Sequence, residues 1–281
     1  MPNPVLNDKV FQQAAVANEA GEADPGWAAP APATGTVYHP PIDDGPVTPY
    51  RTVREGVMTI GGTAAAAGVL LVLLCATAVV GWNLVKLDVN GEVTSFPGWI
   101  FLPLFGALGF AFLTAFKPHL AKFTAPVYAL AEGLVVGAIS HVYDAQWNGI
   151  VIQAVGATIA VFAVMLALYG LRIIRVTDRF RRIVIGATFG ILLLYGVSLL
   201  LSLFGHTPSF LYDSSAFGIL LSVFIAGVAA FNLALDFDII ERGAKAGAPK
   251  DMEWFAAFGL TVTLVWLYLE LLRLFARLRS R

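Results

Sequence analysis

The sequence predicts an all-α integral membrane protein with seven spanning helices. Of its 281 residues, 58% are hydrophobic and 13% are charged, about half the charged fraction of an average soluble domain. The mean hydropathy of +0.75 agrees with this. Long apolar runs recur along the chain, each near the roughly 20 residues that a helix needs to cross a bilayer. Lipid is therefore the predicted solvent for most of the chain.

The amino-terminal segment differs in composition from the rest. Residues 1–50 hold nine of the 15 prolines. Such a segment buries too little apolar surface to offset the entropy of ordering it, and it lacks the basic start and apolar run of a signal peptide. We expect residues 1–52 to be a disordered cytoplasmic tail, either a passive tether or a docking arm, and residues 53–281 to form the membrane domain.

Seven apolar runs with short polar loops between them give the candidate spans. The second is short and begins after Pro97. The runs are Thr59–Trp82, Trp99–Phe116, Thr124–Val142, Ile150–Leu171, Ile183–Phe204, Phe217–Leu235 and Trp254–Leu274.

Two glycine pairs have the four-residue spacing that is typical of closely packed membrane helices. They are Gly133 with Gly137, in the third span, and Gly186 with Gly190, in the fifth. Small residues at this spacing allow helix backbones to approach and pack by dispersion. The pattern predicts a tight bundle.

The distribution of Lys and Arg near the helix ends predicts the orientation. One side carries twelve basic residues: Arg51, Arg54, Lys117, Lys122, Arg172, Arg175, Arg179, Arg181, Arg182, Arg242, Lys245 and Lys250. The other side carries five: Lys86, Arg273, Arg277, Arg279 and Arg281. We expect the amino terminus inside. The basic carboxyl tail does not fit this charge rule. Either it lies outside after seven full spans, or the last segment is re-entrant and returns the tail to the inside.

Three ionisable side chains lie within the predicted spans, where charge is costly and usually faces the bundle interior. Glu132 is in the middle of the third span, Asp236 at the inner end of the sixth, and Glu270 near the end of the seventh. Apolar neighbours and the adjacent Gly133 favour an interior position for Glu132 over mere exposure.

Nearby basic residues offer simpler explanations for some of these acids. Glu270 has Arg273 three residues later, which fits either an interfacial ion pair or an inward position. Asp238, a weaker candidate, has Arg242 four residues later, which favours a solvated pair at a helix end. Asp236 faces another side of the helix than Asp238, because successive residues turn by about 100°, so it is expected to face inward.

Several classes of function are excluded. A net charge of -1 offers no basic surface for nucleic acid. The one cysteine, Cys75, excludes an internal disulfide and a cysteine-based zinc site. HExxH, GxSxG and P-loop patterns are absent from the sequence. We therefore expect no enzyme, no catalytic residues and no cofactor.

Five stretches form a combined pattern, although none is specific alone. They are Glu132–Ser140, Gly149–Ala154, Asp236–Ile240, Ala248–Leu260 and Val265–Arg273. Together they resemble the Bax inhibitor-1/YccA family of transmembrane Bax inhibitor motif proteins, in the form found in actinobacteria. The resemblance covers roughly residues 50–281 and leaves the tail out.

The resemblance implies a seven-helix bundle with the last helix central. It also implies a calcium leak, with a shared proton between an acid near the end of the sixth helix and one in the seventh. These positions are Asp236 and Glu270, where Ca²⁺ would bind transiently. Glu270 replaces the family's aspartate, and its longer side chain changes the geometry of a shared proton. The second span also lacks a basic residue to hold the pair closed.

Two classes of function follow from the resemblance. The leading expectation is a pH-sensitive Ca²⁺ or cation leak in the plasma membrane of a bacterium, involving Asp236, Glu270 and Glu132. The alternative is a non-conducting regulator that binds a membrane protease or another membrane complex; a small-solute transporter is a weaker third option. Carboxylate oxygens favour the first, because hard cations prefer oxygen ligands. Apart from lipid, the expected partners are a cation and a membrane protease.

The charge count leads to a topology prediction. Single cysteines introduced at Asn148 and Arg179 should label differently when an impermeant reagent is added outside intact cells. We expect labelling at Asn148 and protection at Arg179, because the basic loop stays inside. Strong labelling at Arg179 with none at Asn148 would invert the topology.

Overall fold

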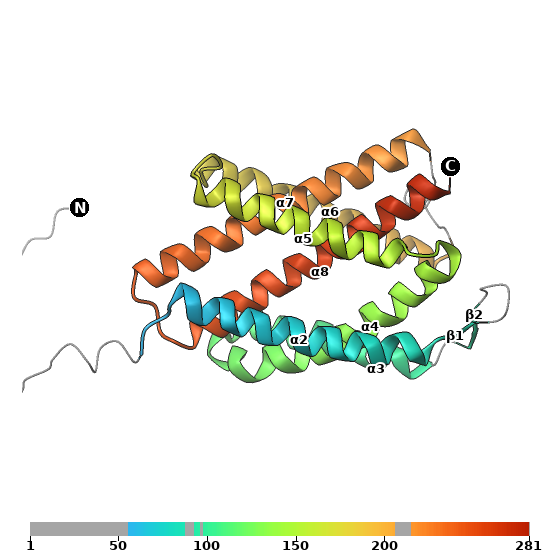
Figure 1. The fold of residues 1–281 in the computed structure, drawn as a ribbon, viewed down its shortest axis with the longest axis horizontal. Helices are drawn as coiled ribbons and strands as arrows, with labels where there is room; N and C mark the ends of the chain where they lie inside the picture. The colour runs from blue at the N-terminus through green and yellow to red at the C-terminus, as the bar shows by residue number, and fades with distance from the viewer. Residues whose placement is uncertain (1–55, 88–92, 96–97, 206–214, 281) are drawn as a thin grey trace, which may run out of the picture. The chain divides into compact units, whose positions relative to one another are not determined.

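A computed structural model of the protein describes residues 56–87, 93–95, 98–205 and 215–280 (Figure 1). The predicted tail, residues 1–52, lies outside the described residues, as do Arg51, Arg54 and Arg281. Within the described part, seven helices are long and apolar enough to cross a membrane. They are α2 (Ile60–Leu84), α3 (Phe101–Phe116), α4 (Ala121–Gln146), α5 (Ile150–Gly170), α6 (Asp178–Leu203), α7 (Ala216–Lys245) and α8 (Met252–Arg279).

These helices confirm the seven predicted spans, with one large change of boundary. Helix α7 runs to Lys245, well beyond the predicted end at Leu235. Hydropathy falls at Asp236 and Asp238, but the backbone stays helical, and Asp238 pairs with Arg181 and Arg242. Asp236 is therefore inside a helix and not at its end.

Side-chain caps explain where several helices begin. The hydroxyls of Thr59, Thr177 and Ser215 accept hydrogen bonds from the backbone N–H groups three residues later, at the starts of α2, α6 and α7. Between α4 and α5 the chain turns at Gly149, whose φ of 77° lies in the left-handed region that glycine adopts without strain. Asp144 stabilises this turn, since its Oδ1 accepts a hydrogen bond from the Gly149 N–H at 2.9 Å.

The last helix is the centre of the bundle. Helix α8 contacts α2, α4, α5 and α7 (Figure 1). In the most apolar stretch of α8, 67% of the residues are buried within the protein. The corresponding share is 17% in each of α3, α5 and α6. The outer helices therefore face lipid with most of their surface, and α8 faces mainly protein. At 28 residues α8 is continuous, which favours a full span over a re-entrant segment.

Helices α2 and α4 pack against each other through glycine, as one of the two glycine pairs predicts. A Cβ atom at Gly133 would overlap the Leu74 carbonyl oxygen, and one at Gly137 would overlap the carbonyl of Ala78. The prediction from Gly186 and Gly190 is wrong, because nothing lies within 4 Å of a Cβ built at either. Equal spacing does not reveal which glycine face has a neighbouring helix.

Two small backbone pairings complete the fold. Strands β1 (Lys86–Leu87) and β2 (Val93–Ser95), which the sequence analysis did not predict, form an antiparallel pair after α2. The chain before α2 is joined to the loop between α7 and α8: Met58 N–H donates to the Ala248 carbonyl at 2.7 Å, and Lys250 N–H to that of Gly56 at 2.9 Å.

The two glycine environments give a matched pair of substitutions. Gly137→Ala should lower the free energy of unfolding by about 1–3 kcal/mol, because the new methyl group separates α2 from α4. Gly186→Ala should be neutral or stabilising by up to about 1 kcal/mol, since alanine favours an open helical position. Thermal unfolding of both purified variants in detergent measures the difference. Equal melting temperatures would contradict the glycine contact between α2 and α4.

Candidate functional site

The best-defined acidic site is built around Glu270 on α8. This side chain is buried, with 1% of its surface exposed. Its Oε1 accepts a hydrogen bond from the Tyr195 hydroxyl of α6 at 2.7 Å and pairs with Arg273 at 2.9 Å. Arg273 also donates to the Tyr195 hydroxyl and lies over its ring at 5.1 Å. The predicted ion pair with Arg273 is thus present, with Glu270 buried and the arginine side chain 34% exposed.

Asp236 forms a second acidic site, on α7. Its Oδ1 lies 3.8 Å from the position a Cβ would take at Gly259 on α8, and the nearby Thr263 hydroxyl donates to the Gly259 carbonyl at 3.1 Å. The absence of a side chain at Gly259 leaves room for the carboxylate between the two helices. Asp236 therefore faces α8, as the sequence analysis expects.

Each of these carboxylates has one oxygen without a partner. Asp236 Oδ2 and Glu270 Oε2 are both buried and accept no hydrogen bond from any described residue. A buried carboxylate oxygen without a donor is costly when the group is ionised. Native proteins satisfy most such atoms, so two of them on facing helices mark a region that merits a functional explanation.

The structure does not bring Asp236 and Glu270 into contact. Asp236 lies level with Gly259 and Thr263, whereas Glu270 is seven residues beyond Thr263 on α8. At 1.5 Å per residue this is about 10 Å along the helix axis. A proton shared directly between the carboxylates, which the resemblance implies, is not formed in this arrangement. Among the described residues, no group of three or more His, Cys, Asp or Glu could hold a metal ion, and transient Ca²⁺ binding at Asp236 and Glu270 stays a prediction.

Glu132, the third candidate acid, lies on α4. It is half-buried, next to the Gly133 contact with α2. Among the described residues Glu132 has no hydrogen bond or ion pair. Its role in an ion pathway stays a prediction.

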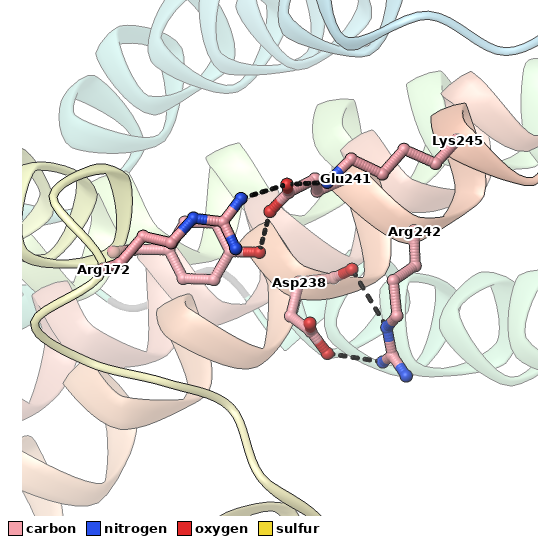
Figure 2. A network of polar contacts seen from close by, with 6 residues as sticks. Arg172, Asp238, Glu241, Arg242 and Lys245 are labelled. Atoms are coloured by element: carbon pink, nitrogen blue, oxygen red, sulfur yellow. Dashed lines mark hydrogen bonds and ion pairs between the residues drawn. The ribbon is translucent and has the colours of Figure 1, made fainter.

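Asp238 belongs to a network of ion pairs at the end of α7 (Figure 2). It pairs with Arg242 at 2.5 Å, as its spacing predicts, and also with Arg181 of α6 at 2.9 Å. The Asp238 side chain is only 14% exposed whereas that of Arg242 is 50% exposed, so the expected pair is solvated on its arginine side only. The second arginine comes from a distant part of the sequence and covers the carboxylate.

Glu241 is the other acid of this network, and the sequence analysis missed it. It pairs with Lys245 one turn later and with Arg172 at 3.3 Å, and it accepts a hydrogen bond from the Tyr169 hydroxyl. Its spacing to Lys245 is a detectable signal. The contacts with Tyr169 and Arg172, at the end of α5, are visible only in the structure.

Glu253 is a second acidic residue whose role was not predicted from the sequence. Its Oε1 accepts hydrogen bonds from both the backbone N–H and the hydroxyl of Thr59, each at 2.9 Å. Glu253 is in the first turn of α8 and Thr59 is the N-cap of α2. The carboxylate thus adds a negative charge beside the positive end of the α2 dipole, and it joins the first and last spans.

Arg277 shows that the end of α8 is not a free basic tail. It is buried, and it donates to the Gly218 carbonyl and to the Ser222 hydroxyl, the latter at 2.6 Å. Both acceptors lie near the start of α7. The guanidinium satisfies polar groups inside the bundle, a role the sequence analysis did not assign to it.

Comparison with known proteins gives a match to a family model. The family model described as Bax inhibitor 1 like matches residues 3–280. The match includes nearly all of the amino-terminal segment, which the sequence analysis left outside the resemblance. No curated protein and no solved structure gave a significant match.

The Glu253 contact predicts an ordered series of stabilities. Glu253→Gln keeps an oxygen that accepts from Thr59 and should be mild. Glu253→Leu leaves the Thr59 N–H without an acceptor and should cost about 1–3 kcal/mol. Asp251→Ala is the control, because Asp251 is exposed and makes no capping hydrogen bond, and should change stability by less than about 0.5 kcal/mol. Thermal unfolding in detergent measures the series; equal values for Gln and Leu would show that Glu253 does not cap α2.

Proposed function

Because the chain belongs to the Bax inhibitor 1 like family, we propose that this multi-pass membrane protein lets cations, Ca²⁺ among them, leak across the bilayer at a rate set by pH. The observation that carries the proposal is the unpartnered, buried oxygen of Asp236 on α7 and of Glu270 on α8. In this proposal the amino terminus is cytoplasmic and the membrane is the plasma membrane of a bacterium.

Protonation changes what these two sites need. A protonated carboxyl group carries no net charge and tolerates the dry interior of a bundle. An ionised one favours an arrangement that admits water or a cation. Hard cations such as Ca²⁺ bind oxygen ligands. Ionisation would therefore bias a two-state packing of α7 against α8 towards the open state.

Asp236 is the stronger candidate for the pH-sensitive group. Glu270 has Arg273 as a countercharge within hydrogen-bonding distance, whereas no ion pair of Asp236 occurs among the described residues. Ionisation of Asp236 thus adds an uncompensated charge to the interface with α8. Because about 10 Å of helix separates the two sites, they act as successive positions and not as one titrating pair.

Flux measurements on liposomes that contain the purified protein test this proposal. We expect Ca²⁺ entry to rise with pH, as Asp236 ionises. Asp236→Asn cannot ionise and should hold flux near its low-pH level throughout. Asp178→Asn removes an exposed acid at the start of α6 and should leave the profile unchanged.

A variant that carries both substitutions tests whether Asp236 and Glu270 titrate as one coupled pair or as two independent sites. Effects of Asp236→Asn and Glu270→Gln on the logarithm of the flux should add, since sites more than about 7–10 Å apart act independently. If Asp236→Asn keeps the wild-type pH profile, Asp236 is not the sensor. Absence of flux at every pH would overturn the leak and favour the alternative, a non-conducting regulator of a membrane protease or other complex.

A further inference from the structure

The end of α7 borders a cavity of about 540 Å³ that neither the leak proposal nor the acidic sites use. Its size falls within the range of about 300–1,000 Å³ typical of ligand sites. The end of α5, the loop that follows it and the last turns of α7 form its walls. The lining residues are Tyr169, Arg172, Ile174, Arg175, Val176, Asp238, Glu241, Arg242 and Lys245.

The charges of the lining favour an anion. Four of the lining side chains are basic and two are acidic, a formal excess of two positive charges. Both acids are already compensated. Glu241 pairs with Arg172 and Lys245, and Asp238 pairs with Arg242 (Figure 2); Asp238 also pairs with Arg181. The cavity thus has no spare carboxylate to bind a cation.

One basic residue has no internal partner. Arg175 is exposed, and its side chain makes no hydrogen bond or ion pair with another described residue. Arg172 pairs with Glu241, yet 71% of its side chain is exposed, so part of its guanidinium is available to a ligand. A guanidinium presents a planar fork of donors that matches the oxygens of a phosphate group.

The backbone at Arg172 is strained. Its φ of 58° lies in the left-handed region, and Arg172 is the only non-glycine residue there within the described part of the chain. Such a conformation costs on the order of 1 kcal/mol or more and persists where the surroundings require it. Here it holds the guanidinium at the edge of the cavity.

The surroundings of the loop favour a lipid as the source of the phosphate. Arg172 stands between Leu171 and Ile173, whose side chains are both exposed, at 72% and 66%. Exposed aliphatic side chains directly beside an exposed arginine suit the boundary between headgroups and acyl chains. The loop also joins the ends of two spanning helices, α5 and α6, where that boundary is found.

We propose that this cavity binds the phosphate-bearing headgroup of an anionic phospholipid, with Arg172 and Arg175 on the phosphate and Leu171 and Ile173 against the acyl chains. Arg242 and Lys245 add positive charge from α7. The lipid would thereby join the loop between α5 and α6 to the end of α7.

Native mass spectrometry of the detergent-solubilised full chain tests the site. We expect saturable binding of one phosphatidylglycerol molecule, and weaker binding of phosphatidylcholine. Arg175→Gln should lower the affinity for phosphatidylglycerol about fivefold. This factor corresponds to about 1 kcal/mol for each basic residue near the headgroups. Arg172→Gly should weaken binding of phosphatidylglycerol by at least as much. Thermal stability should change little, because glycine adopts the left-handed conformation freely and the lost ion pair with Glu241 is an exposed one.

A matched control variant distinguishes a specific site from general surface charge, and a soluble anion distinguishes a lipid from free phosphate as the ligand. Arg179→Gln removes an exposed basic residue of the same region that does not line the cavity, and it should leave binding unchanged. Equal loss in Arg179→Gln and Arg175→Gln would overturn the proposal in favour of general surface charge. Displacement of phosphatidylglycerol by millimolar inorganic phosphate, with equal affinity of phosphate alone, would overturn the lipid as occupant and identify a soluble phosphate site.

Discussion

The charges on α8 impose the constraint on which the rest of the bundle depends. Glu253, Glu270, Arg273 and Arg277 lie along this one helix, and lipid cannot hydrate them. Each finds its partner inside the protein: Thr59 at one end, Tyr195 about two thirds of the way along, and Gly218 with Ser222 at the other end. The apolar outer helices cover these contacts, which places α8 at the centre.

The sequence was sufficient for the number and order of the spans, because apolar runs of the right length have few alternatives in lipid. It failed where a helix continues through charged residues. The end of α7 beyond Leu235 carries Asp238, Glu241 and Arg242. A hydropathy analysis interprets such a charged segment as a loop. Their partners on α5 and α6 keep them helical, and those partners are separated from them by some 57 to 72 residues.

The same limit applies to the candidate site. The pairs Glu270–Arg273 and Asp238–Arg242 were predictable, because helical spacing places their side chains together. The contact of Glu253 with Thr59 spans 194 residues, and no local pattern reveals it. The charge count treats Arg273 and Arg277 as loop charges, whereas the structure shows that both bind groups of the bundle.

The contact between Glu253 and Thr59 also has a consequence for biosynthesis. At about 5–20 residues per second, the ribosome needs roughly 10–40 seconds to make the 194 residues between the two. The first span therefore leaves the insertion machinery with its cap incomplete and waits for the last one. Quality control that acts on nascent chains during this interval would meet α2 without its Glu253 contact in every molecule. If synthesis stopped before α8, this contact would never form.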